Sequence, residues 1–322
     1  MHPLARKGTW VVAAGLAFGL FGTGVLGTGS GIGSGTWQQA GGSEAGGRAA
    51  RHLPQTRTVL FDASHGEPGS ISSMQPNPLV EDLNPADEDD WTGTLSAWGV
   101  GLQRTGRYVI RTLPSSGRIT YGDPAHALDL ERFDTLILPA PAQPLTEAER
   151  AAVLRWLRDG GGLFLIAGGA ASRDALGDLV AREPFGFSFE RAGPAQGPAM
   201  TALRAGGPIL AGPFGQVAGS TVTGDTALRL DSGGNPTVRG WIWRAGEDRR
   251  SGRGLVFATA ALGRGHVAAW SGGAAVDDGT PTRRPTGQAR RAGGQADNHG
   301  WAHPPTTDGR LALNATAWLA SG

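Results

Sequence analysis

The chain has 322 residues and is almost neutral, with 29 lysine and arginine side chains against 28 aspartate and glutamate side chains. It contains no cysteine, and its one lysine is Lys7. The rest of the chain therefore has no thiolate nucleophile, disulfide framework, Schiff-base lysine or P-loop lysine. A formal net charge of +1 gives no general attraction to nucleic acid, so we expect no nucleic-acid partner.

Residues 1–26 have the layout of an export signal, in which Arg6 and Lys7 precede an apolar stretch at 10–21. When the stretch is extended to Leu26, it approaches the length of a membrane span, so an uncleaved anchor is the alternative. Residues 27–56 are rich in Gly, Ser, Ala and Gln, which is typical of a linker. We expect residues 57–322 to be exported, to the periplasm, the cell surface or the medium, and either released or tethered at the N-terminus.

The first half of this domain reads as strands alternating with helices. A strand is expected at 58–62 and an amphipathic helix at 91–106, with Leu95, Trp98 and Leu102 on one face. Further strands are expected at 108–113 and 133–139. Thr146 is a good N-cap for a helix that continues to Asp159 and has acidic residues in its first turn.

A nearly all-apolar strand at 163–167 follows, as expected for the centre of a parallel sheet. Residues 184–250 are less regular and predict an insertion of strands and loops over the sheet edge. A hairpin is expected from 254–260 and 265–270, and a closing helix at 311–319. Together these elements predict one α/β domain with a doubly wound, mostly parallel sheet flanked by helices and a β-rich insertion, whose ligands bind at the carboxyl ends of the strands.

Several segments in this order resemble class I glutamine amidotransferase-like domains, in particular an exported branch related to the amidotransferase-like regions of gliding-motility and intraflagellar-transport proteins. The matching segments span most of residues 57–320. They are 59–66, the pair Asp90-Trp91, 134–141, 145–149, 160–167, 212–215, 263–267, 277–279, 298–301 and 313–319. The resemblance implies a flavodoxin-like, amidotransferase-like fold.

The resemblance also implies where a nucleophile would stand. In active amidotransferases the turn after the glycine-rich strand carries a cysteine, and here that turn reads Ala167-Gly-Gly-Ala170. Glutaminase chemistry by the family mechanism is therefore unavailable to this chain. No G-x-S-x-G elbow occurs in the sequence to replace it.

Asp62 and His65 follow the first strand directly, at the rim where this architecture places its ligands. A carboxylate beside an imidazole can orient it and tune its pKa for proton transfer, or the two can share a metal. Alternatively, Asp62 caps the loop and His65 holds it closed through backbone carbonyls.

A second group of candidates comes late in the chain. Asp277 and Asp278 follow the last strand of the hairpin, and Asn298, His299 and Trp301 return from a long loop. If they reach the same rim as Asp62 and His65, two carboxylates could act as an acid and base pair or bind a divalent metal, while the other three contact a ligand. The alternative is a turn with solvated polar residues.

Trp91 begins the first predicted helix and is either a stacking platform for a sugar or an anchor in the core. The window 62–90 has eight acidic residues and no lysine or arginine, which is typical of a solvated loop. The arginine clusters at 249–253 and 283–291 read mainly as solvated loops.

The sequence leaves three functions open. The first is an exported domain that binds a polar small molecule or a glycan without amide transfer. The second is a secreted hydrolase that uses Asp62, His65, Asp277 and Asp278 as acid, base or metal ligands. The third is a scaffold that assembles with other envelope proteins, by analogy with the motility-type relatives.

Overall fold

The computed structural model describes residues 56–66, 95–195, 202–203, 206–222, 224–247, 249–272, 301 and 307–322. The predicted leader and nearly all of the predicted linker lie outside these ranges. So do five of the predicted site residues: Trp91, Asp277, Asp278, Asn298 and His299. Within the described ranges, no helix has both the length and the apolar character needed to cross a membrane.

The strands form one ten-stranded sheet and a separate small hairpin. The parallel half of the large sheet has the strand order β2 (Tyr108–Leu113), β1 (Arg57–Asp62), β3 (Thr135–Pro139), β4 (Gly162–Ile166) and β12 (Gly265–Trp270). The antiparallel half continues through β11 (Leu255–Leu262), β10 (Arg239–Trp243) and β6 (Ala202–Leu203), with β9 (Gly224–Leu230) on β11 and β5 (Phe187–Ala195) on β9. The separate hairpin is β7 (Ala211–Gly212) and β8 (Gly215–Gln216).

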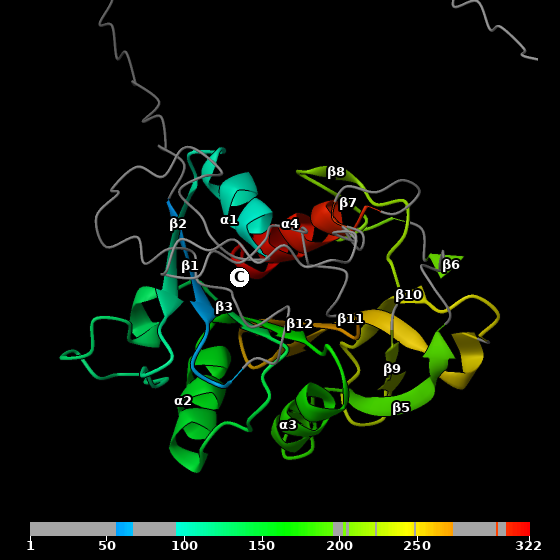
Figure 1. Cartoon of the computed structure of the whole chain (residues 1–322), viewed down its shortest axis with the longest axis horizontal. Coiled ribbons are helices and arrows are strands. Elements are labelled where there is room, and N and C mark those ends of the chain that lie inside the picture. The colour runs from blue at the N-terminus through cyan, green and yellow to red at the C-terminus, as the bar shows by residue number, and fades with distance from the viewer. Residues whose placement is uncertain are drawn as a thin grey trace, which may run out of the picture. The chain divides into compact units, whose positions relative to one another are not determined.

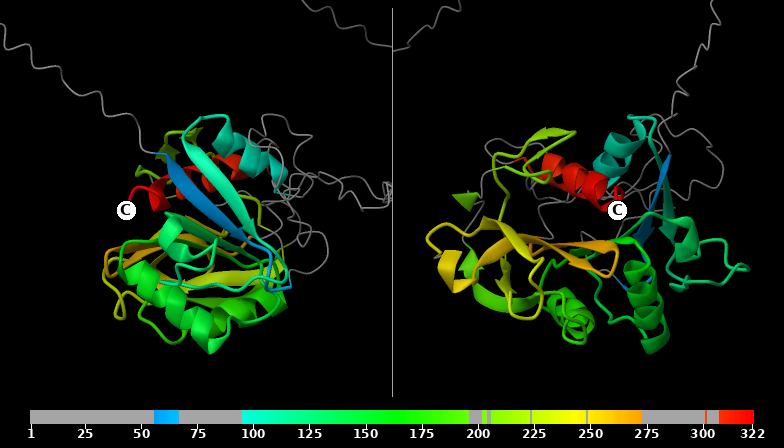
Figure 2. Two further views of the ribbon diagram at one scale, coloured as in Figure 1. Left: turned by 90° about the vertical axis from the view of Figure 1, so that its left-hand side faces the viewer. Right: turned by 180° about the vertical axis from the view of Figure 1, so that it is seen from behind.

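Helices cover both faces of the sheet, which gives the three layers of a doubly wound fold (Figures 1 and 2). On one face lie α1 (Ser96–Gln103) and α4 (Asp308–Leu319). On the other lie α2 (Glu147–Arg158) and α3 (Ala170–Val180). Two short 3-10 helices, at Leu130–Arg132 and Arg249–Ser251, complete the described elements.

These elements confirm the predicted fold class and most of the predicted strands and helices. The expected apolar face of α1 is confirmed, because Leu95, Trp98 and Leu102 are all buried. One expectation was wrong: four of the six strands within 184–250 do not cover the sheet edge but extend the sheet itself, since β9 and β10 both hydrogen-bond to β11. Backbone pairing to the free edge of β11 satisfies their N–H and C=O groups, which a covering loop would leave unpaired.

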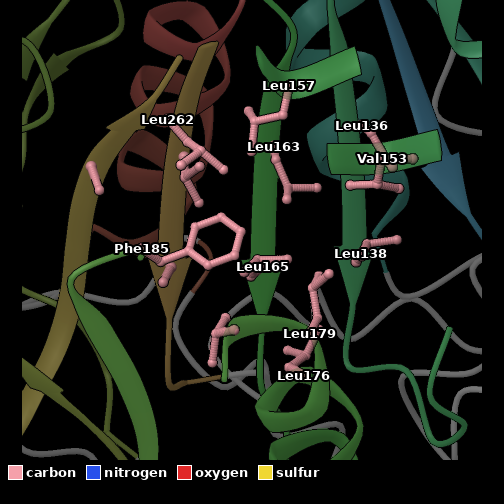
Figure 3. Packing of buried hydrophobic residues seen from close by; sticks show 14 of the residues in the cluster. Leu136, Leu138, Val153, Leu157, Leu163, Leu165, Leu176, Leu179, Phe185 and Leu262 are labelled. Atoms are coloured by element: carbon pink, nitrogen blue, oxygen red, sulfur yellow. The ribbon is translucent and has the colours of Figure 1, made fainter. Parts of the chain in front are cut away.

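The core on the α2 and α3 side shows how the sheet is held (Figure 3). Alternate residues of β3 and β4, such as Leu138 and Leu165, point toward Val153 on α2 and Leu176 and Leu179 on α3. All of these side chains are essentially inaccessible to solvent. Because the strand ends beyond this core are fixed, the loops that leave them start from defined positions.

Gly265 permits the close approach of β12 and α2. A methyl group at this position would overlap the carbonyl oxygen of Leu157 and lie 2.5 Å from that of Gly161. We expect Gly265→Ala to lower the free energy of unfolding by about 2–3 kcal/mol, as overpacking against backbone does. Gly177→Ala is the matched control, because Gly177 lies within α3 with open space around it, and we expect that change to stabilise by about 0.5–1 kcal/mol. Urea denaturation measures both, and equal stability of the two variants would contradict the packing.

Candidate functional site

The rim at the carboxyl end of β1 is built around Asp62, which is fully buried at the last position of the strand. Its Oδ1 accepts hydrogen bonds from the backbone N–H of Ser64 at 3.0 Å and from the Ser64 hydroxyl at 2.6 Å. Its Oδ2 lies 2.7 Å from Nδ1 of His65. The predicted neighbours Asp62 and His65 are therefore in direct contact, and Asp62 also shapes the loop that carries His65.

The other ring nitrogen of His65 faces a second carboxylate. Nε2 of His65 lies 3.3 Å from Oε2 of Glu149, in the first turn of α2. Glu149 occupies this place because it closes a capping box with Thr146, whose backbone N–H and hydroxyl donate to Oε2 at 3.0 and 2.7 Å. Its Oε1 accepts from the N–H of Ile119 at 3.1 Å. We call the contacts of Asp62, His65 and Glu149 the Asp62–His65–Glu149 bridge.

The main chain at His65 adds two further connections. Its carbonyl oxygen accepts hydrogen bonds from the N–H groups of Ala142 and Gln143, both at 2.9 Å. Gly66 follows with a φ of +63°, and a Cβ at this position would lie 3.1 Å from Nε2 of the Gln143 side chain. The β1 loop is thereby fastened to the loop between β3 and α2.

The pKa of His65 is raised to about 9. Burial by itself lowers this pKa, but the hydrogen bonds and negative charges of Asp62 and Glu149 outweigh it. The pKa of Glu149 is lowered. Burial by itself raises this pKa, but the hydrogen bonds from Thr146 and Ile119 and the positive charge of His65 outweigh the effect of burial. At neutral pH the bridge is a buried imidazolium between two carboxylates, with both ring nitrogens as donors.

This arrangement limits what His65 can do chemically. An imidazolium that donates from both nitrogens cannot accept a proton, so His65 is not poised as a general base at neutral pH. Among the described residues, no group of three or more His, Asp or Glu side chains is placed to hold a metal ion. The expected divalent metal stays a prediction for the acidic residues outside the described ranges.

The turn between β4 and α3 is the one at which the sequence resemblance implies that a nucleophile would stand. Here the buried hydroxyl of Ser172 accepts the N–H groups of Gly168 and Gly169 at 2.7 and 3.0 Å and so caps α3. Gly168 and Ala170 are exposed to solvent. The turn is closed by the hydrogen bonds of the Ser172 hydroxyl with its main chain.

Trp301 is the one late candidate that the structure describes. Its ring lies 6.4 Å from that of Trp98, and its carbonyl oxygen accepts the N–H of Gly309 at 3.2 Å. These contacts pack it against α1 and α4, and its expected contact with a ligand stays a prediction. Since Asp277, Asp278, Asn298 and His299 lie outside the described residues, the meeting of the early and late stretches also stays a prediction.

Comparison with known proteins shows a likeness in fold and nothing more specific. No protein-family model matches the chain, and no curated protein matches it significantly. The solved N-terminal domain of mmIFT52 superposes with a TM-score of 0.50 at 12% identity, covering 82% of this chain and 98% of that domain.

Two ThuA-like proteins were also found. One, from Parabacteroides merdae, has a TM-score of 0.43 at 13% identity and covers 83% of this chain and 91% of its own. The other, from Bacteroides uniformis, has a TM-score of 0.42 at 11% identity and covers 83% of this chain and 92% of its own. The described strands and helices have the doubly wound α/β architecture that the sequence predicted, and the mmIFT52 domain is similar to this chain in fold.

Proposed function

We propose that the chain is an exported amidotransferase-like domain that binds a polar ligand at the carboxyl rim of its parallel strands, without glutaminase activity. Glycans are the first ligand class to test. The observation that carries the proposal is the Asp62–His65–Glu149 bridge, which uses the rim's buried charges to fasten loops together. A rim fixed in this way is preorganised for binding, while its one described imidazole is already fully paired.

Among the described residues, the exposed ones nearest the ends of β3 and β4 are neutral. Gln143 is exposed beside the β1 loop, and Gly168, Ala170 and Ala171 are exposed where β4 passes into α3. The strands that lead into these two places, β3 and β4, are direct neighbours in the sheet. Amide and main-chain groups both donate and accept hydrogen bonds, which suits the hydroxyl groups of a sugar better than a strongly charged ligand.

A pair of tryptophan substitutions tests the location. Ala171→Trp places a large side chain on the exposed first turn of α3, and we expect it to reduce binding at least tenfold by occluding the rim. Ala151→Trp is the matched control, an equally exposed alanine in the middle of α2. Isothermal titration against a panel of neutral and acidic oligosaccharides gives the affinities. No binding by the parent chain, or equal loss in both variants, would contradict the proposal.

The hydrolase function has less support from the described residues. In the form that uses His65 as a general base, it needs this ring to take up a proton, and the bridge holds the ring in its protonated form. Activity on a hydrolase substrate panel that is lost in His65→Ala, while the protein stays folded, would favour the hydrolase over the binding domain.

A further inference from the structure

Ala140, which directly follows β3 at the rim, has a backbone conformation that alanine seldom adopts. Its φ is +55°, and every other described residue with φ in the left-handed region is a glycine. This region brings Cβ too close to the following carbonyl oxygen, so alanine disfavours it about tenfold. A chain with 54 glycines thus has alanine at a position where glycine would be free of strain.

The residue that follows Ala140 adds a second local preference against this conformation. Pro141 favours an extended backbone at the residue before it, with φ of about −120°. By its local preferences alone, Ala140 would therefore be extended, and the chain after β3 would leave the sheet in a different direction. Residues strained in this way persist only where surrounding contacts hold them.

Backbone hydrogen bonds on both sides of Ala140 hold it in place. Its own N–H donates to the carbonyl of Ile166 at 2.7 Å, which continues the pairing of β3 with β4. Two residues farther along, the N–H groups of Ala142 and Gln143 both donate to the His65 carbonyl at 2.9 Å. These last two hydrogen bonds cross from the segment after β3 to the β1 loop.

The segment 140–145 is fixed at its ends more firmly than in its middle. Ala140 is fully buried at one end, and the Leu145 side chain is buried in the core at the other. In the middle, two N–H groups share the single carbonyl oxygen of His65, and Gln143 is exposed to solvent. Water can therefore replace these two hydrogen bonds without disturbing the core.

We propose that residues 140–145 form a latch on the β1 loop, which the His65 carbonyl holds closed and the strain at Ala140 biases toward opening. In the closed state, which the structure describes, a ligand meets only the exposed groups of the rim. In the open state Ala140 is extended, and the His65 carbonyl and the N–H groups of Ala142 and Gln143 become available to a ligand. The inference goes beyond the proposed function, because the latch opens with or without a ligand.

Amide hydrogen exchange of the full chain, followed residue by residue by NMR, measures the opening of the latch. The N–H groups of Ala142 and Gln143 report on the latch, and those inside β3, which pairs with β1 and β4, report on the sheet. We expect the latch amides to exchange about 100-fold faster than the β3 amides or more. Low urea should accelerate them little, because opening a short segment exposes little surface.

Replacing Ala140 with glycine removes the strain from the closed state. We expect Ala140→Gly to slow exchange at Gln143 about fivefold, somewhat less than the full strain because glycine also gains freedom in the open state. Ala142→Gly is the matched control, since it removes the same methyl group two residues away, where φ lies outside the left-handed region. There glycine only adds freedom to the open segment, so exchange at Gln143 should be about twofold faster.

Latch amides that exchange no faster than the β3 amides would overturn the proposal, because the segment would then open only with the sheet. Exchange at Gln143 that is as fast in Ala140→Gly as in the parent chain, or faster, would also overturn it. So would an equal effect of the two glycine substitutions. No ligand enters this experiment, so a failure of the latch is distinct from a failure of the proposed function.

Discussion

Replacing His65 with glutamine is expected to lower the free energy of unfolding by about 3–5 kcal/mol, because it leaves two buried carboxylates without their shared cation. Glutamine has a similar length but no charge, and its single amide cannot donate to Asp62 and Glu149 on opposite sides. The expected loss agrees with the rise of the His65 pKa to about 9, which corresponds to about 3 kcal/mol. Urea denaturation near pH 6 followed by circular dichroism measures it.

The pH dependence of this loss has a defined sign. Because the pKa of His65 is higher in the folded chain than the ordinary 6.5, its stabilisation is complete below pH 6.5 and disappears as the pH rises through about 9. The pKa of Glu149 is lowered, so its contribution is lost only as the pH falls below the ordinary 4.5. The difference between parent and His65→Gln should therefore be largest near pH 5–6.5 and shrink toward pH 9.

His126→Gln provides the control for this change. His126 is half-buried, and the described part of the chain gives its side chain no carboxylate partner. We expect its substitution to cost less than about 1 kcal/mol without the same pH dependence. A His65→Gln variant as stable as His126→Gln across this range would show that the bridge does not hold the rim.

Replacing Asn314 with alanine is expected to cost about 2 kcal/mol, since it leaves the buried carbonyl of Ile209 without a partner and removes two part-buried hydrogen bonds. The fully buried side chain donates to the carbonyls of Ile209 and Gly215 at 3.1 and 2.9 Å and accepts the N–H of Phe214 at 2.9 Å. It thus ties the β7–β8 hairpin to α4. Asn314→Asp should be at least as damaging, because a carboxylate cannot donate to the two carbonyls.

Arg310→Ala is the control for Asn314. Arg310 lies on the same helix and also contacts the hairpin, at the carbonyl of Gln216, but its side chain is exposed. We expect it to change stability by less than about 0.5 kcal/mol. If thermal denaturation gave the two variants the same midpoint, the hydrogen bonds of Asn314 would not be stabilising the hairpin.

The sequence predicted the elements whose signals are local. Short apolar runs located the central strands, and Thr146 marked the start of α2, where it is confirmed as the N-cap. Helix α3 was not predicted, because its N-cap is Gly169, which has no side chain to cap it, and because Gly177 within it weakens the helical pattern. The strands of 184–250 were placed wrongly because pairing with β11 depends on contacts between distant residues.

Only part of the site was predicted, again because only contacts between nearby residues leave a local pattern in the sequence. Asp62 and His65 are three residues apart, so their closeness could be predicted from the end of β1 and the loop that follows it. Glu149 was recognised only as an acidic residue in the first turn of a helix, because its contact with His65 spans 84 positions and leaves no local pattern. That missed partner turns an apparent acid–base pair into a fully paired cation.

The protonation state of His65 directly tests whether this ring is a cation paired with both Asp62 and Glu149. Two-dimensional ¹H–¹⁵N NMR of the histidine rings, assigned with His65→Gln, follows both ring nitrogens through a pH titration. The bridge predicts that Nδ1 and Nε2 of His65 both stay protonated until the pH approaches about 9. A ring that loses a proton near its ordinary pKa of 6.5 would contradict it and would return His65 to the candidates for a general base.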